Sequence, residues 1–321
     1  MALRGFLNTK FSRKRIFALR TFILTVAVVS LSKLQYKPST GNRLHVLEHQ
    51  FRVVINECTE AFTVHNVRTR QSDTLFSAVD GLFIIGLHFC QFSVSSGAQT
   101  FCVKGAVVDE CIASRLPRLS TGSHGYAVSL THAAIIVKAE YLSLTRYMVV
   151  EDDIFFDTDF ARSQVSNEST SFKRLLATKE WNLIRLSYRP YFLETAFAHM
   201  NAHGGKLKLS KFQCPKECLC STRSEIGPEF CLLSDDGPNF CDLRGSDFYI
   251  LNQTSGVGIL KALLNVDVSE RVIDFFVLQR ANVKQWLATY PYSTQTSLDT
   301  SVQLQRGFMS EFSSKCLIKV S

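Results

Sequence analysis

The sequence predicts an α/β fold, with a mixed sheet flanked by helices in a single domain that follows an N-terminal membrane helix. Two observations support this prediction. Short apolar runs rich in β-branched and aromatic residues alternate with longer runs of helical period along residues 51–321. The chain has 321 residues, of which 46% are hydrophobic and 20% charged, which is enough for one large domain with a substantial core.

The basic charge of the chain is concentrated near its N-terminus. Residues 1–50 hold nine of the 36 Lys and Arg and only one of the 28 acids, Glu48, so the rest of the chain holds 27 of each. The formal net charge of +8 therefore belongs to the first 50 residues, and the body is close to neutral. A nucleic-acid-binding function is disfavoured, because such proteins carry their basic residues on the folded body.

Residues 16–34, IFALRTFILTVAVVSLSKL, are predicted to form a transmembrane signal-anchor. A helix of these 19 residues spans about 29 Å, close to the hydrocarbon thickness of a bilayer. The basic residues before it predict that residues 1–15 form a cytoplasmic tail and that the body lies in the lumen, after a stem over 35–50. A cleaved signal peptide and a buried soluble helix are the alternatives.

The body is predicted to begin with a strand and to alternate from there. The predicted strands, in chain order, cover 51–56, the second part of 75–89, 146–150, 182–188 and 247–252. The predicted helices cover the first part of 75–89, 126–144, 171–181 and 255–266. The tail over 285–303 is polar and rich in turn formers, and it is expected to be irregular.

Half of the ten cysteines lie in residues 214–241, which are expected to be a cysteine-rich insertion that forms a loop: Cys214, Cys218, Cys220, Cys231 and Cys241. Their spacing lacks paired C-x2-C motifs, and no histidine lies among them, so a zinc site is disfavoured. Disulfides are favoured, because a body beyond a membrane anchor lies in an oxidising compartment. Sequons at Asn167 and Asn252 are compatible with a lumenal glycoprotein.

Three acidic residues, Glu151, Asp152 and Asp153, directly follow the apolar run MVV. In layered α/β folds ligands bind beyond the carboxyl ends of the strands, where this triplet is expected to lie. Carboxylate oxygens suit Mn²⁺ and Mg²⁺, and Mg²⁺ sites commonly use one or two of them and leave positions for phosphates and water. The sequence therefore predicts a divalent-cation site here, with a solvated acidic turn as the alternative.

Several motifs, in their order along the chain, resemble those of glycosyltransferase family 25, the lipopolysaccharide and procollagen galactosyltransferase-like group. That family has a Ser-His on a helix about twenty residues before a strand that ends in Glu-Asp-Asp. Here His132 lies nineteen residues before Glu151, and Thr131 replaces the Ser. WNLIRL resembles a Trp-Asp strand of the family, with Asn182 for Asp, and the segments that resemble its opening strand and later motifs are FRVVIN, GSDFYILN, VIDFF and YPYSTQTSLD.

The resemblance implies a GT-A-like (Rossmann-like) fold and transfer of a hexose, galactose or glucose, from a UDP-sugar to a glycan or protein acceptor. It implies that Asp152 and Asp153 hold Mn²⁺ or Mg²⁺, and that Glu151 orients the metal shell or contacts the donor sugar. Asp274 in VIDFF is the expected general base, with a capping or structural role as its alternative. The residues expected to contact or brace the substrates are His132, Thr131, Asn56, Arg68, Gln295 and Ser297.

Such an enzyme is expected in the Golgi or endoplasmic reticulum membrane as a single-pass type II protein, or secreted if its N-terminal segment is cleaved. Its expected partners are the UDP-hexose donor, the acceptor and, through the N-terminal helix, the membrane, without nucleic acid. Two alternatives remain open. One is a non-catalytic, disulfide-rich lumenal binding or scaffold protein of the same fold, which the departures at Thr131 and Asn182 favour. The other is a metal-dependent hydrolase that uses the same carboxylates.

Overall fold

The structure is a computed structural model that describes residues 40–65, 78–86, 90, 98–119, 124–156, 170–178, 180–190, 218–233, 243–244, 247–265, 284–289, 292–295 and 317–320. The predicted cytoplasmic tail and signal-anchor, residues 1–34, lie outside these ranges. No helix within them is both long and apolar enough to cross a membrane. The chain divides into two units, Met1–Val46 and Leu47–Ser321, and the fold described below is that of the second.

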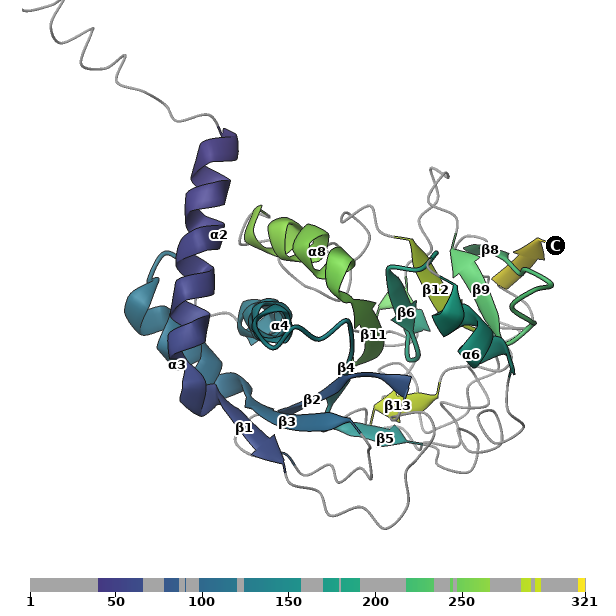
Figure 1. The fold of residues 1–321 in the computed structure, drawn as a ribbon, viewed down its shortest axis with the longest axis horizontal. Helices are drawn as coiled ribbons and strands as arrows, with labels where there is room; N and C mark the ends of the chain where they lie inside the picture. The colour runs from purple at the N-terminus through teal and green to yellow at the C-terminus, as the bar shows by residue number, and fades with distance from the viewer. Residues whose placement is uncertain are drawn as a thin grey trace, which may run out of the picture. The chain divides into compact units, whose positions relative to one another are not determined.

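A mixed sheet of ten strands is the framework of the described residues, as the predicted α/β fold requires. Its strands are β1 (Phe62–His65), β2 (Gly81–Gly86), β3 (Gln99–Lys104), β4 (Arg146–Glu151), β6 (Leu183–Arg185), β8 (Cys218–Ser221), β9 (Phe230–Leu233), β11 (Phe248–Asn252), β12 (Gln285–Ala288) and β14 (Leu317–Val320). They pair in the order β1-β3-β2-β4-β11-β6-β12-β9-β8-β14 (Figure 1). Two small sheets pair β5 (Ile154–Phe156) with β13 (Ser293–Gln295), and β7 (Arg189–Pro190) with β10 (Leu243–Arg244).

The direction of the central strands defines two edges of the sheet. Strands β3, β2 and β4 are parallel to one another, and β6 is parallel to β12. Strand β11 lies between β4 and β6 and is antiparallel to both, so all five parallel strands point the same way. We call the edge where these five strands end the carboxyl edge and the opposite one the amino edge. The acidic triplet follows β4 and so lies at the carboxyl edge.

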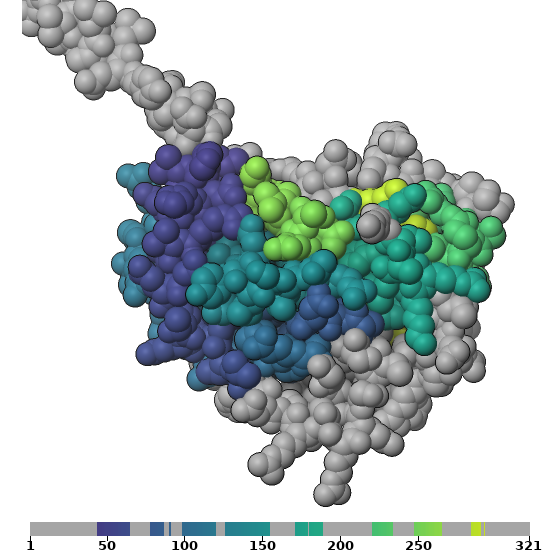
Figure 2. Space-filling view, viewed as in Figure 1, coloured from purple at the N-terminus to yellow at the C-terminus, as the bar shows by residue number. Residues whose placement is uncertain are grey.

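The described residues form five α-helices and one short 3-10 helix. They are α2 (Thr40–Glu57), η1 (Thr59–Ala61), α3 (Gly105–Arg115), α4 (His124–Tyr141), α6 (Thr170–Ala177) and α8 (Gln253–Asn265). Helix α4 is seen end-on in Figure 1 with α8 beside it, and their surfaces adjoin in Figure 2. Their contact is close at Gly256, where a Cβ atom would lie 2.9 Å from Ile136 Cγ2 of α4.

The two faces of the sheet differ in composition. Because side chains alternate along a strand, Met148 and Val150 of β4 share one face with Ile250 of β11. This face packs against Phe172 and Leu175 of α6 in a core of apolar residues that includes Trp181, Phe230 and Trp286. The opposite face, toward α4, carries polar groups among its apolar residues: Tyr147 and Glu151 of β4, Tyr249 of β11 and Arg185 of β6.

The predicted opening strand over residues 51–56 was wrong. FRVVIN lies in helix α2, which also covers residues 40–50 of the predicted stem. The β-branched residues suggested a strand, but the buried positions Phe51, Val54, Ile55 and Cys58 follow the spacing i, i+3, i+4, i+7 of a helix, while Val53 is 45% exposed. Tertiary packing of this stripe outweighs local strand propensity.

Two C-terminal predictions also need correction. The tail was expected to be irregular, but QWLA forms β12, in which all four residues are buried between β6 and β9. The cysteine-rich insertion was expected to be a loop, but it supplies strands β8 and β9 to the main sheet. A four-residue strand covered on both faces shows no alternation, so its pattern did not identify it.

Disulfides, predicted in preference to zinc, are present. Within the described residues, Cys220 pairs with Cys231 across strands β8 and β9. Two more bridges, Cys58–Cys111 and Cys90–Cys102, join the end of α2 to α3 and residue 90 to β3. The sequon at Asn252 has a structural use, because its side-chain oxygen accepts from the backbone N–H of Ser255 (2.9 Å) and caps α8. Its amide nitrogen donates to the Trp181 carbonyl, so a glycan on that nitrogen would compete with this bond.

Candidate functional site

The acidic triplet sits in a tight turn at the carboxyl edge. Glu151 ends β4, and Asp152 and Asp153 form the turn that leads into β5. The backbone N–H of Glu151 donates to the Asp247 carbonyl, and that of Asp152 to the Ile85 carbonyl, each at 2.9 Å. These bonds tie the turn to β2 and to the residue before β11. All three acids are half-buried, so their side chains are neither sealed in the core nor fully solvated.

A second carboxylate stands beside Glu151. Asp247 precedes β11. The register of Phe248 with Val150 brings Asp247 opposite Glu151, on the face of the sheet toward α4. On its other side Asp247 faces the end of β6, where Ser187 Oγ donates to Asp247 Oδ2 (2.8 Å). Asp247 and Ser187 are each 3% exposed, so both side chains are buried.

A buried histidine of helix α4 lies next to Glu151 and Tyr249. His132 is fully buried, its Nδ1 lies 2.6 Å from Tyr249 Oη, and its Nε2 lies 3.4 Å from Glu151 Oε1. The second separation indicates an electrostatic contact rather than a well-formed hydrogen bond. Burial, followed by Tyr147 and the Glu151 carboxylate, raises the pKa of Tyr249 well above its ordinary value. Tyr249 therefore stays a neutral hydroxyl and can hold the His132 ring toward Glu151.

The C-terminal segment returns to the acidic turn. Strand β13 pairs antiparallel with β5, and Gln295 is the register partner of Ile154, the residue after Asp153. The backbone of Gln295 is therefore adjacent to the acidic turn, although the two lie more than a hundred residues apart in the sequence. The sequence placed Gln295 at the site only through the family resemblance, and this pairing supports the placement of its main chain.

The remaining predicted site residues have different positions. The Thr131 hydroxyl donates to the Ala127 carbonyl at 2.9 Å, so its described hydrogen bond lies within helix α4. Asn56 is exposed in the last turn of α2, whose final residue, Glu57, pairs with Arg115 at the far end of α3. Helix α2 leads through η1 to β1, whose first residue, Phe62, pairs with Val103 near the end of β3, and strands β3 and β2 lie between β1 and β4. Arg68, Asp274 and Ser297 lie outside the described residues.

Sequence analysis missed Asp247 and Tyr249 as site residues. GSDFYILN was identified only as a motif that contains a strand, and no site role was predicted for its acid. The available signal was the side-chain period of two, which gives Asp247 and Tyr249 a common face. Their relation to Glu151 and His132 needed the pairing of β11 with β4 and the packing of α4, which a single sequence does not contain.

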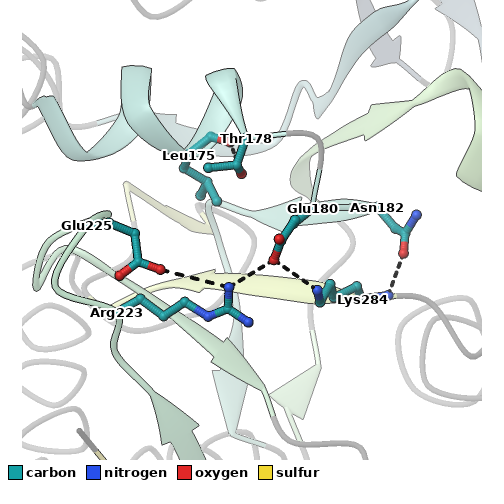
Figure 3. A network of polar contacts seen from close by, with 7 residues as sticks. All are labelled: Leu175, Thr178, Glu180, Asn182, Arg223, Glu225 and Lys284. Atoms are coloured by element: carbon teal, nitrogen blue, oxygen red, sulfur yellow. Dashed lines mark hydrogen bonds and ion pairs between the residues drawn. The ribbon is translucent and has the colours of Figure 1, made fainter.

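A second polar cluster lies at the amino edge (Figure 3). Glu180, just before β6, accepts from Arg223 (2.8 Å) and from Lys284 Nζ (3.3 Å), and Glu225 lies 3.8 Å from Arg223. The backbone N–H of Lys284 donates to Asn182 Oδ1 at 2.8 Å, so Asn182 joins the starts of β6 and β12. These side chains are at least 37% exposed apart from Asn182, and we assign the cluster a structural role.

No group of three or more His, Cys, Asp or Glu side chains within the described ranges is arranged to hold a metal ion. The donor set at the acidic turn is two adjacent carboxylates, Asp152 and Asp153, with Glu151 and Asp247 next to them. Comparison of the chain with protein-family models gives no match, and comparison with curated proteins gives none either. The function is therefore argued from the geometry of the carboxyl edge.

Proposed function

We propose that the protein is a metal-assisted hexosyltransferase of GT-A-like fold, which moves galactose or glucose from a UDP-sugar to a glycan or protein acceptor. One observation carries the proposal: the Glu-Asp-Asp triplet lies in a turn at the carboxyl end of a central parallel strand, where α/β sheets bind ligands. The return of Gln295 to that turn, and the approach of His132 to Glu151, add support from distant parts of the chain.

Asp152 and Asp153 would hold the Mn²⁺ or Mg²⁺ ion. The fit rests on their chemistry and setting, since two half-buried carboxylates on a backbone fixed by hydrogen bonds can give oxygen ligands while a diphosphate and water complete the shell. When bound, the ion supplies charge neutralisation on the departing UDP. Glu151, which lies beside His132, would orient the metal shell or contact the donor sugar.

The other expected participants lie outside the described residues. Asp274 is the proposed general base, which would take the proton of the acceptor hydroxyl, and Arg68 and Ser297 are proposed to contact the substrates. We further propose that the N-terminal segment anchors the enzyme in the Golgi or endoplasmic reticulum membrane with this domain in the lumen. Disulfides such as Cys58–Cys111 accord with an oxidising compartment.

The test is release of UDP from UDP-galactose and UDP-glucose, with EDTA or Mn²⁺ present. We expect EDTA to abolish turnover, Mn²⁺ to restore it, and the double substitution Asp152→Asn with Asp153→Asn to lower turnover about 100-fold or more. Asp80→Asn is the matched control, because Asp80 accepts from Arg146 at the other end of β4. Full activity in chelator would reject the metal assignment. Metal-dependent binding of UDP-sugar without turnover would indicate the scaffold protein, and free sugar without acceptor the hydrolase.

A further inference from the structure

The burial of Asp247 costs folding free energy that its hydrogen bond does not fully offset. Its side chain is 3% exposed, and its single side-chain hydrogen bond, from Ser187 Oγ, uses Oδ2 alone. Oδ1 is equally shielded from solvent and makes no hydrogen bond. A buried carboxylate oxygen without a donor destabilises the folded state, so natural proteins rarely keep one without use.

The acidic neighbour of Asp247 increases that cost. Glu151 stands opposite it on the same face of the antiparallel pair β4–β11, where like charges destabilise. The next positions of this face hold the apolar Val149 of β4 and Phe83 of β2, and the buried Arg185 of β6, two residues before Ser187. The place therefore holds two acids, a buried arginine and an unused acceptor at the edge where the proposed donor binds. A ligand that brings a hydrogen-bond donor between them would offset both penalties.

We infer that Asp247 is a substrate-binding residue, whose Oδ1 accepts a hydrogen bond from a hydroxyl group of a sugar bound at the carboxyl edge. This inference rests on the proposed function and deepens it, because it assigns a residue to recognition of the sugar rather than of the diphosphate. Ser187 is a positioning residue, which fixes the carboxylate through Oδ2 and leaves Oδ1 for the ligand. The hydroxyl belongs either to the donor hexose or to the acceptor glycan, and the experiment separates these sources.

Two substitutions isolate the role of Oδ1. Asp247→Asn keeps the size of the side chain and an oxygen for Ser187, but removes the charge and offers an N–H where the ligand needs an acceptor. Ser187→Ala leaves the carboxylate and removes the bond that orients it. Asp80→Asn, at the amino edge, controls for loss of one acid from the same sheet.

The readouts are kcat/KM for donor hydrolysis without acceptor, kcat/KM for transfer, and the melting temperature. For Asp247→Asn we expect kcat/KM to fall at least 10-fold and the melting temperature to stay the same or rise, because a costly buried charge is lost. Ser187→Ala should lower kcat/KM less, and Asp80→Asn should leave it unchanged. A loss in both reactions assigns the hydroxyl to the donor, and a loss in transfer alone assigns it to the acceptor.

Deoxy-hexose UDP donors sharpen the result. If the donor hydroxyl is the partner, one deoxy donor should be used equally by wild type and Asp247→Asn, since both then lack the same bond. An active wild type with an equally active Asp247→Asn variant overturns the inference and leaves the proposed function intact. A variant that melts much lower, with unchanged kcat/KM per folded molecule, also overturns it. A wild type without turnover on any UDP-sugar rejects the proposed function, and the inference with it.

Discussion

The two edges of the central sheet carry polar clusters of opposite design. At the amino edge, Glu180 lies between Arg223 and Lys284 (Figure 3), and all three side chains are at least 37% exposed. At the carboxyl edge four acids, Glu151, Asp152, Asp153 and Asp247, gather at two strand ends and one turn. One of them, Glu151, lies beside the buried imidazole of His132, with 3.4 Å between Glu151 Oε1 and His132 Nε2.

The difference teaches how a structural cluster can be told from a functional one. Exposed ion pairs cost little free energy to form and contribute little to stability. A structural role that joins neighbouring segments is therefore enough to explain the amino-edge network. At the carboxyl edge, Asp247 is buried with one oxygen that accepts no hydrogen bond, which costs stability and points to a ligand-binding role. Perturbing each edge in turn should therefore give different responses in stability, pH dependence and salt dependence.

The largest effect on stability is expected from His132→Ala. The substitution leaves a cavity under α4 and removes the partner of the buried Tyr249 hydroxyl, which together should cost about 2–4 kcal/mol of unfolding free energy. Urea unfolding measures it. His132→Asn and His132→Gln separate the two contacts, because the first keeps a group near Tyr249 and the second a donor near Glu151. A loss below ~0.5 kcal/mol for His132→Ala would contradict the described packing.

Alkaline pH should act on the buried tyrosines between the edges. Burial raises the pKa of Tyr147, Tyr249 and Tyr292 above the ordinary value of about 10, so above that pH the unfolded chain releases protons that the folded chain retains. Their contribution to stability is complete below pH ~10 and should then fall by about 1.4 kcal/mol per pH unit for each tyrosine.

Denaturant unfolding between pH 9 and 11.5, followed with tyrosinate absorbance at each pH, measures this effect. Tyr249→Phe is the control, since it removes one tyrosine from the titration while it keeps the ring. Tyrosines that ionise in the folded protein near pH 10, before unfolding, would contradict their burial.

The smallest effect is expected at the amino edge, from Glu180→Gln. Hydrogen bonds from Arg223 and then Lys284 lower the pKa of Glu180, so its contribution is present at neutral pH and is lost as pH falls through that lowered pKa. We expect a small decrease in melting temperature that disappears in about 1 M salt, because the pair is exposed and screened. Glu225→Gln, at the longer 3.8 Å contact, should change less. A salt-independent loss as large as that of His132→Ala would remove the distinction between the edges.

Much of the fold was predictable where one pattern dominates a long segment. The helix over 126–144 appears as α4, and the strands over 146–150 and 247–252 appear as β4 and β11, because apolar period and strand length agree there. Prediction failed at FRVVIN and at QWLA. In the first, packing of Phe51 and Ile55 overrides β-propensity, and in the second, burial on both faces removes the alternation that marks a strand.

The candidate site divides in the same way. The sequence located Glu151, Asp152 and Asp153 at a strand end, since an acidic run after MVV is a local feature. It did not locate Asp247, whose importance depends on its position opposite Glu151, or Tyr249, whose hydroxyl meets a histidine 117 residues away. Asn56 lies in helix α2 rather than at the end of the strand that the sequence predicted for residues 51–56.

The sequence by itself determined the alternation of helices and strands, the near-neutral body and the acidic triplet at a strand end, because each depends on neighbours within a few residues. Only the tertiary structure decided that β11 enters antiparallel between parallel strands, that β13 returns to the acidic turn, and that His132 and Asp247 flank Glu151. The physical reason is that strand order and face-to-face packing are set by burial summed over contacts distant in sequence, which no local pattern encodes.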